Sequence, residues 1–221
     1  MGTISNQLLA PLKDPFTLRL GGHRWLNEER EEAYSDWLAW ILEQLVTPDK
    51  IIPLFCGNNA ADLTAQCVGP LTVRRENPFV TTSESIRRTD IEIYFGHKKT
   101  ILVEVKMIDA NKIAADQLHD QSNYGADFVR RFLLAPSGEE KSVPAGFNLV
   151  LWRDICLRLR GIVPSTCREN ISIAAMIVAF VGAVEQNVLQ LPSTDEWYRV
   201  TSAIVDYLTE FLGRTNDNGC K

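Results

Sequence analysis

The sequence has 221 residues, of which 45% are hydrophobic and 23% are charged, so it predicts one medium-sized globular domain. This composition excludes a disordered tail, a coiled-coil rod and a small protein held together by disulfides. The net charge of −5 at pH 7 argues against binding of nucleic acid through bulk charge alone, but it leaves room for a local basic groove.

Several sequence features indicate the cellular compartment in which the protein is expected. The first residues, MGTISNQLLAPLKD, contain no cationic segment followed by a long apolar run, and the five cysteines include no CxxC pair. The most apolar stretch, 171–184, has no charge but is shorter than the roughly 20 residues that a membrane span needs. We therefore expect a cytoplasmic protein with reduced thiols, no membrane segment and a buried helix at 171–184.

In chain order, the first elements are helical. Residues 1–26 contain prolines and a glycine pair and predict an irregular N-terminal arm. Apolar residues recur at helical spacing over 27–46, and the Thr-Pro-Asp at 47–49 predicts the end of that helix. A weaker helical pattern follows at 59–68, and 71–75 predicts a strand that carries basic residues outward.

The middle of the chain has the clearest pattern. Polar and apolar residues alternate over 89–95 and again over 100–107, and the GHKK at 96–99 separates them, so the segment predicts a β-hairpin. Further on, the patterns predict a helix at 114–124, strands at 128–135 and 147–152 joined through the loop at 136–138, and then three helical pieces broken near 161–164 and 191–192.

Strands in the middle with helices on both sides predict an α/β fold, in which a small mixed β-sheet is flanked by helices. We expect a core at 27–160 and a C-terminal helical part at 161–221 that packs on this core. The last helix has an apolar stripe over 197–211, which either packs on the core or forms the seam of a homodimer.

The predicted hairpin brings ionisable side chains together. Glu104 and Lys106 lie two residues apart on one strand face, about 7 Å from each other. If the turn centres on His97, Asp90 lies opposite Glu104 on the same face. Two carboxylates suit Mg²⁺, and Lys106 is placed to orient or deprotonate a water that attacks a phosphodiester. The alternative is a set of solvated cross-strand pairs, each worth under about 1 kcal/mol.

Motifs around this hairpin resemble those of a known family. The runs TDIEI at 89–93 and VEVK at 103–106 are followed by DQSNY at 120–124, which is similar to a Gln-x-x-Tyr motif. Upstream, EEAYSDWLAWIL at 31–42 is similar to the opening helix of a bacterial branch, and RFLLAP at 131–136 and WRD at 152–154 match more weakly. Together these runs resemble the PD-(D/E)XK nuclease superfamily, although Thr89 replaces the proline of the motif.

The resemblance implies a restriction-endonuclease-like core and a Mg²⁺-dependent endodeoxyribonuclease, with Mn²⁺ able to substitute, that acts in bacterial phage defence or genome processing. It implies that Asp90 and Glu104 bind the metal and that Lys106 positions the water. An acidic residue of the first helix completes the metal shell; Glu31 fits by its spacing, and the adjacent Glu32 is the alternative. The resemblance implies that two further residues, Gln121 and Tyr124, approach the metal or the nucleic-acid backbone.

Basic doublets occur between residues 74 and 131 and predict contacts to DNA phosphates. The expected nucleic-acid-binding residues are Arg74, Arg75, Arg87 and Arg88, and the alternative for each doublet is a solvated position at a strand end. Two other functions fit the same sequence. One is a non-catalytic nucleic-acid-binding or scaffold protein with this fold, and the other is an effector that stays silent until a partner protein activates it.

Overall fold

A computed structural model of the protein describes residues 31–81, 84, 86–113, 123–143 and 145–190. The helices are α2 (Glu31–Leu45), α3 (Pro48–Cys56), α4 (Ala61–Gln66), α6 (Trp152–Glu169) and α7 (Ile171–Ala183), which continues into a π-helical turn, Val184–Val188. The strands are β1 (Leu71–Val80), β2 (Ile86–Phe95), β3 (Lys98–Val105), β4 (Arg130–Ala135) and β5 (Asn148–Leu151).

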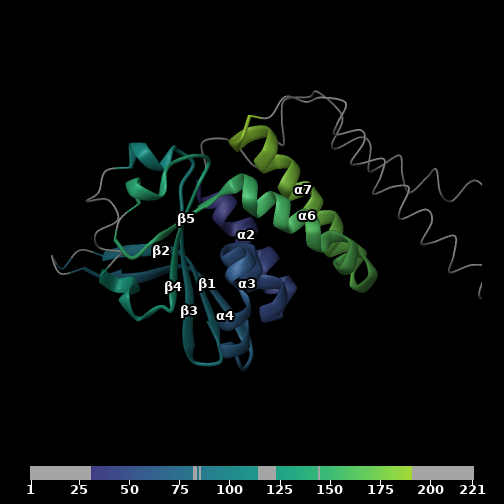
Figure 1. The fold of residues 1–221 in the computed structure, drawn as a ribbon, viewed down its shortest axis with the longest axis horizontal. Coiled ribbons are helices and arrows are strands. Elements are labelled where there is room, and N and C mark those ends of the chain that lie inside the picture. The colour runs from purple at the N-terminus through teal and green to yellow at the C-terminus, as the bar shows by residue number, and fades with distance from the viewer. Residues whose placement is uncertain (1–30, 82–83, 85, 114–122, 144, 191–221) are drawn as a thin grey trace, which may run out of the picture.

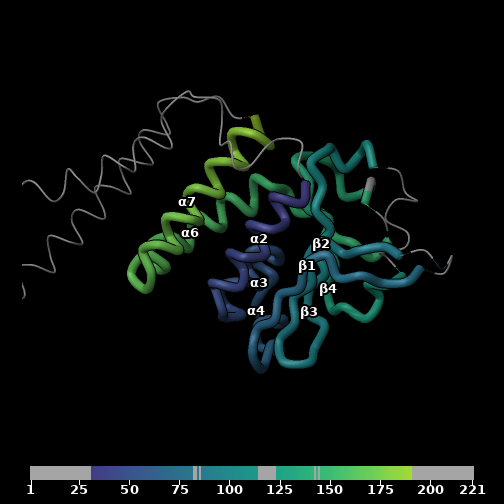
Figure 2. The backbone as a smooth tube through the Cα atoms, turned by 180° about the vertical axis from the view of Figure 1, so that it is seen from behind, coloured from purple at the N-terminus to yellow at the C-terminus, as the bar shows by residue number. Residues whose placement is uncertain are grey.

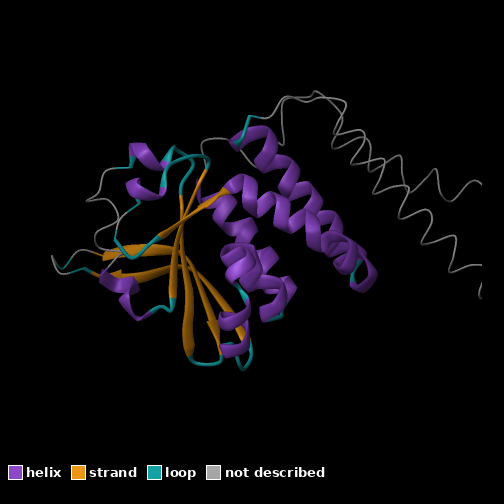
Figure 3. Ribbon diagram, in the orientation of Figure 1, coloured by secondary structure: helices purple, strands orange, loops and turns teal. Residues whose placement is uncertain are grey.

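The strands form one mixed sheet in the order β1-β2-β3-β4-β5. β1 pairs with β2 and β2 with β3 in antiparallel fashion, whereas β3–β4 and β4–β5 are parallel pairs. Figure 1 and Figure 3 show the long helices gathered on one side of the sheet, with α6 and α7 lying next to each other. The expected α/β fold, a small mixed β-sheet flanked by helices, is therefore confirmed, and the sheet has five strands.

Side-chain alternation divides the sheet into two faces. Ile91, Ile93 and Val103 belong to the large core, which they share with buried residues of α2, α3, α6 and α7. Figure 2 shows these four helices from behind, next to one another on the same side of the strands. Tyr94 and Leu102 belong to a smaller cluster on the other face, together with residues of the loops that follow β3 and β4. The period-two pattern read from the hairpin sequence is thus confirmed, since each set lies on its expected face.

One helix was not predicted. The Thr-Pro-Asp at 47–49 ends α2, as expected, but Pro48 also begins α3. Proline suits the first turn of a helix, because the N–H groups of that turn have no partner within the helix, so the lack of an N–H costs nothing. The fixed φ angle of proline also matches that of a helix. α3 then buries Ile51, Ile52 and Phe55 in the large core.

The predicted break near 161–164 is wrong, because α6 runs without interruption through Gly161 and Pro164 to Glu169. Packing overrides these two weak helix formers, since α6 buries Ile155, Leu159 and Val163 against the core. The 160/161 boundary expected between the core and the C-terminal part therefore falls inside one helix. The chain turns instead at Asn170, whose side chain accepts hydrogen bonds from the first backbone amides of α7.

The C-terminal part packs on the core as far as the structure describes it. α7 contains the predicted buried helix, and Ile177 and Phe180 are fully buried. Arg160 of α6 donates two hydrogen bonds to Glu185, at 3.0 and 2.5 Å, and so joins α6 to the π-helical turn. Residues 171–188 form one helix that is apolar and long enough to cross a membrane, and 56% of this stretch is buried inside the protein. The stripe at 197–211 lies outside the described residues.

Candidate active site

The candidate site lies where β2 and β3 separate, at the end of the hairpin far from its turn. Ile91 pairs with Val103 and Ile93 with Ile101. If this register is extended one residue past the last pair, it sets Asp90 opposite Glu104. Nearer the turn, Tyr94 pairs with Lys99 and Phe95 with Lys98, which leaves Thr100 as an extra residue in β3. The hairpin is therefore a two-residue turn, Gly96 and His97, combined with a β-bulge.

The bulge places the two carboxylates on one face. With a regular ladder from the turn onward, Asp90 would oppose Val103 and would lie on the face opposite to Glu104, because a shift of one residue reverses every side chain. The predicted pairing of Asp90 with Glu104 is consistent with this register. Its physical origin is the extra residue Thr100, which is fully buried, and not a turn centred on His97.

Asp90 leaves its strand partner and turns toward β3. The pairing of β1 with β2 lapses between Arg75–Ile91 and Asn77–Thr89, and Glu76 at this point has a positive φ angle of 45°. The Oδ2 atom of Asp90 instead accepts a hydrogen bond of 2.7 Å from the backbone amide of Val105. The Asp90 side chain therefore takes the place of a backbone acceptor at the end of β3.

Lys106 lies at the centre of the cluster. Its Nζ atom is 2.9 Å from Glu31 Oε1, 3.1 Å from Glu104 Oε1 and 3.9 Å from Asp90 Oδ2. Glu31 begins the described part of α2, and its second oxygen accepts a bond of 3.3 Å from the Met107 amide. In this structure Glu31, rather than the exposed Glu32, joins the cluster.

Burial controls the charges here. The Glu104 side chain is only 4% exposed, and its Oε2 atom has no hydrogen-bond partner among the residues that the structure describes. Burial, followed by the neighbouring Asp90 carboxylate, raises the pKa of Glu104 to about 8. Burial also raises the pKa of Asp90 to about 6, although the Lys106 ammonium opposes this effect. For Lys106 burial lowers the pKa, but attraction by Glu104, Asp90 and Glu31 outweighs it, so its pKa lies above the ordinary value.

The donor set fits a hard divalent cation in its chemistry. When all groups are ionised, three carboxylates face a single ammonium, and the Oε2 atom of Glu104 lacks a partner among the described residues. The Lys106 ammonium, however, occupies the space between the three carboxylates. Among the described residues, no three His, Cys, Asp or Glu side chains already stand together as a metal site. A cation and the ammonium therefore compete for the same oxygen atoms.

The backbone of Lys106 is held by two further elements. Its amide donates to the carbonyl oxygen of Leu134 in β4 at 2.8 Å, and its own carbonyl accepts a bond of 3.2 Å from Trp152 Nε1. Trp152 is fully buried and packs edge-on against Tyr34 of α2. In the sequence the run WRD is only a weak part of the motif resemblance, and nothing in it indicates that the indole N–H supports Lys106.

One predicted site residue, Gln121, lies outside the described residues, and another, Tyr124, is not part of this cluster. Tyr124 belongs to a second group, where its hydroxyl accepts a bond of 3.1 Å from Asn77 Nδ2 and its ring stacks on Phe79 with centroids 4.4 Å apart. Lys99 lies over the same ring, 5.3 Å from its centroid. The Tyr124 ring is therefore occupied by protein contacts on the second face of the sheet.

The same group contains a carboxylate that sequence reasoning did not single out. Glu92 is fully buried and accepts bonds from Thr89 Oγ1 at 2.9 Å, Asn77 Nδ2 at 3.0 Å and Tyr94 Oη at 2.6 Å. The available signal was an acidic residue inside an otherwise apolar strand, where a buried charge needs several donors. The alternation pattern alone did not separate Glu92 from a solvated position.

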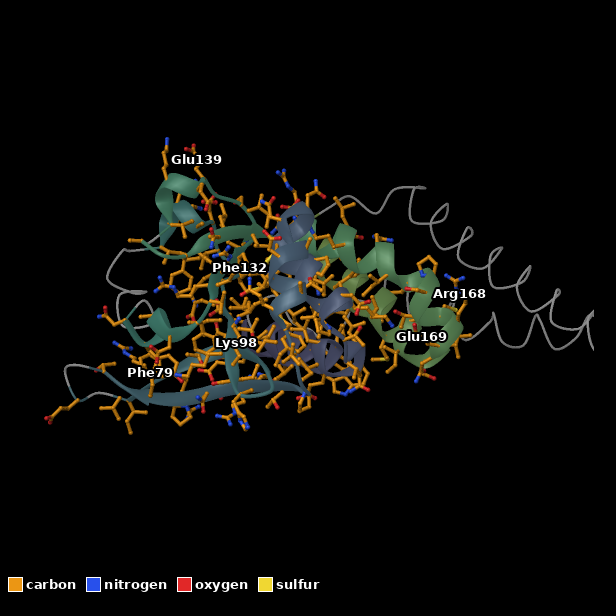
Figure 4. All side chains as sticks on the ribbon, turned by 60° about the horizontal axis from the view of Figure 1, so that its bottom comes forward. Phe79, Lys98, Phe132, Glu139, Arg168 and Glu169 are labelled. Carbon is orange, nitrogen blue, oxygen red and sulfur yellow. The ribbon has the colours of Figure 1, made fainter. Side chains whose placement is uncertain are left out.

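The predicted DNA-binding arginines differ in their surroundings. Arg75 forms ion pairs with Asp36 of α2 and with Glu76, so it helps to hold α2 to β1. Arg74 is exposed and lies over the Tyr94 ring, 4.9 Å from its centroid. Arg87 and Arg88 are exposed on the hairpin of β1 and β2, and Arg88 is 3.1 Å from Glu76. The labelled residue Phe79 shows the position of this hairpin in Figure 4, and Phe79 pairs with Arg87.

No protein-family model matches the chain, and no curated protein or solved structure is significantly similar to it. Functional inference therefore depends on the geometry of the site and on the motifs in the sequence.

Proposed function

We propose that the protein is a Mg²⁺-dependent nuclease of the PD-(D/E)XK type that hydrolyses phosphodiester bonds in DNA, built on a restriction-endonuclease-like core. The observation that carries the proposal is the convergence of carboxylates from α2, β2 and β3 on the ammonium of Lys106. Burying charged groups costs free energy, because each charge loses its hydration. Buried clusters of this kind therefore occur most often where the charges serve a function. The five-stranded mixed sheet is compatible with such a core.

Glu31, Asp90 and Glu104 are the residues that would hold the metal. A bound Mg²⁺ supplies electrostatic stabilisation for the negative charge that develops on the phosphate during hydrolysis. The Oε2 atom of Glu104 has no donor in the described part of the chain, and this supports the assignment, since a buried carboxylate oxygen without a donor is costly unless a cation binds it. Mn²⁺ is expected to substitute, because it accepts the same oxygen ligands.

Lys106 acts through its ammonium group. In the metal-free protein the surrounding carboxylates keep its pKa above the ordinary value, so the side chain is charged and can only donate hydrogen bonds. This favours a role in orienting the attacking water and stabilising negative charge over a role in removing a proton from it. The hydrogen bonds from its backbone to Leu134 and Trp152 fix the starting point of this side chain.

DNA is the proposed substrate because exposed arginines lie on the strand that carries Asp90. Arg88 precedes Asp90 by two residues, and Arg87 lies beside it on the hairpin. Arginines at such positions suit contacts to phosphates on either side of a scissile bond. We further propose a cytoplasmic bacterial enzyme that acts in phage defence or genome processing, on the strength of the motif resemblance.

Replacing Arg87 and Arg88 by alanine is expected to weaken DNA binding without changing the metal site. The slope of log K against log salt is negative, and the loss of two phosphate contacts should make it less negative by about 2. The measurement is a gel-shift titration in EDTA at several salt concentrations. Arg168→Ala is the matched control, because this exposed arginine lies at the far end of α6 (Figure 4). An unchanged slope in the double variant would place the DNA elsewhere on the protein.

One observation favours a second candidate, a non-catalytic scaffold. Lys106 already contacts all three carboxylates, and in such a scaffold it would neutralise them permanently. Mn²⁺ titration by calorimetry separates the two functions. The nuclease binds Mn²⁺ at this cluster, Glu31→Gln weakens that binding by about tenfold or more, and Glu32→Gln leaves it unchanged because Glu32 is exposed. The scaffold binds no Mn²⁺ in any of the three proteins.

A further inference from the structure

Glu92 and Thr89 form a hydrogen bond across Asp90 that a regular strand does not allow. Side chains at odd and even positions of a strand point to opposite faces, so residues 89 and 92 should lie on different sides of the sheet. Thr89 Oγ1 nevertheless donates to Glu92 Oε1 at 2.9 Å. β2 must therefore twist between these two residues, and Asp90 lies within the twisted part.

The same twist coincides with the gap in the sheet. Pairing between β1 and β2 lapses at Asp90, and Asn77, whose pairing with Thr89 resumes the ladder, donates to Glu92 Oε2 at 3.0 Å. Glu92 thus binds side chains from both strands immediately beyond the gap. Lys106 contacts none of Glu92, Thr89 and Asn77 among its ion-pair partners, which are Glu31, Asp90 and Glu104.

We propose that Glu92 is a positioning residue for Asp90, and that it acts through its hydrogen bond with Thr89. By holding Thr89 on the Glu92 face, this bond fixes the twist that turns the Asp90 carboxylate away from β1 and onto the amide of Val105. The proposal deepens the proposed nuclease function, since it explains what places one of its metal-binding carboxylates. Its geometric part does not depend on a metal or on turnover.

The role of Glu92 requires its shape and hydrogen bonds, and it does not require contact with metal or substrate. Glutamine at this position can still accept from Asn77 and Tyr94, while its amide donates to the Thr89 hydroxyl. We therefore expect Glu92→Gln to keep most of the cleavage activity. A residue that bound the metal through its charge would lose activity on the same change.

The test is amide hydrogen exchange measured by NMR on the full-length, metal-free protein. The Val105 amide reports the Asp90 carboxylate, whereas the next amide, Lys106, bonds to Leu134 in β4 and serves as the internal reference. In Thr89→Val we expect the Val105 amide to exchange about tenfold faster while the Lys106 amide changes by less than about twofold. Thr89→Ser, which keeps the hydroxyl, should match the wild type.

Tyr94→Phe is the matched control, because it removes a different donor from Glu92 and leaves the Thr89 bond in place. It should leave the Val105 amide unchanged. An unchanged Val105 amide in Thr89→Val, or equal acceleration of the Val105 and Lys106 amides, overturns the proposal. If Thr89→Val does not fold, Thr89→Ala removes the same hydroxyl without the bulk of valine and is judged by the same criteria.

A second readout links the geometry to function. Thr89→Val should weaken Mn²⁺ binding by about tenfold, in the range known for groups that orient a metal ligand, and Thr89→Ser should restore it. If the wild type binds no Mn²⁺, the proposed nuclease function fails, and the exchange experiment still decides the positioning role. If the wild type binds Mn²⁺ and Thr89→Val binds it equally well, only the positioning role fails.

Discussion

Glu104→Gln is expected to slow cleavage strongly and, at the same time, to stabilise the metal-free protein. Glu104 is nearly fully buried beside Asp90, and its pKa of about 8 means that ionising it opposes folding. Glutamine has the shape of the protonated acid and carries no charge to bury. At pH 8 we expect the free energy of unfolding to rise by about 0.5–2 kcal/mol, and cleavage to fall by about 10²–10³-fold.

Urea unfolding at pH 8 in EDTA and a cleavage assay in Mg²⁺ measure these two effects. Glu139→Gln is the control, because Glu139 is exposed and pairs only with the exposed Lys141 among the described ion pairs. It should change neither quantity. If Glu104→Gln loses both activity and stability, its carboxylate is a structural group of the folded protein, and the functional interpretation of its burial is wrong.

The metal-free protein is also expected to lose stability as the pH rises from about 5 to 8. Folding raises the pKa of Asp90 from 3.8 to about 6 and that of Glu104 from 4.5 to about 8. Between the unfolded and folded values the native state binds more protons than the unfolded chain, so each increase in pH favours unfolding. The stabilising contribution of these two groups is complete below their unfolded pKa values and is lost above their folded ones.

Thermal unfolding at several pH values, with EDTA and with Mg²⁺, measures this dependence. The cation competes with protons for the same carboxylates, so its stabilising effect should grow as the pH rises. In Glu104→Gln the fall in stability toward pH 8 should be smaller, and Mg²⁺ should have little effect. A wild-type protein whose stability in EDTA rises steadily from pH 5 to 8 would contradict the account of the cluster.

The hairpin could be predicted from sequence because alternation assigns each side chain to a face without knowledge of the partner strand. Its register could not be derived in the same way. The bulge at Thr100 inserts one residue that no local signal marks, and a register that sets Asp90 opposite Glu104 depends on it. Glu31 was chosen from the motif resemblance, and its contact with Lys106 depends on how α2 packs on the sheet.

Features that depend on tertiary packing could not be predicted from the sequence. α6 continues through Gly161 and Pro164 because its apolar side chains are buried against the core, and local propensity alone predicts a break there. Trp152 and Glu92 support the site through hydrogen bonds between segments far apart in the chain, or through a twist that spacing rules exclude. Only the folded structure brings these groups to Lys106 and Asp90.

The most direct test of the central claim is cleavage of supercoiled plasmid by the purified wild type and by Lys106→Ala, each in Mg²⁺, in Mn²⁺ and in EDTA. We predict that only the wild type nicks or linearises the plasmid, and only when a divalent cation is present. Equal cleavage by Lys106→Ala, or wild-type cleavage that persists in EDTA, would contradict metal-dependent hydrolysis at this cluster.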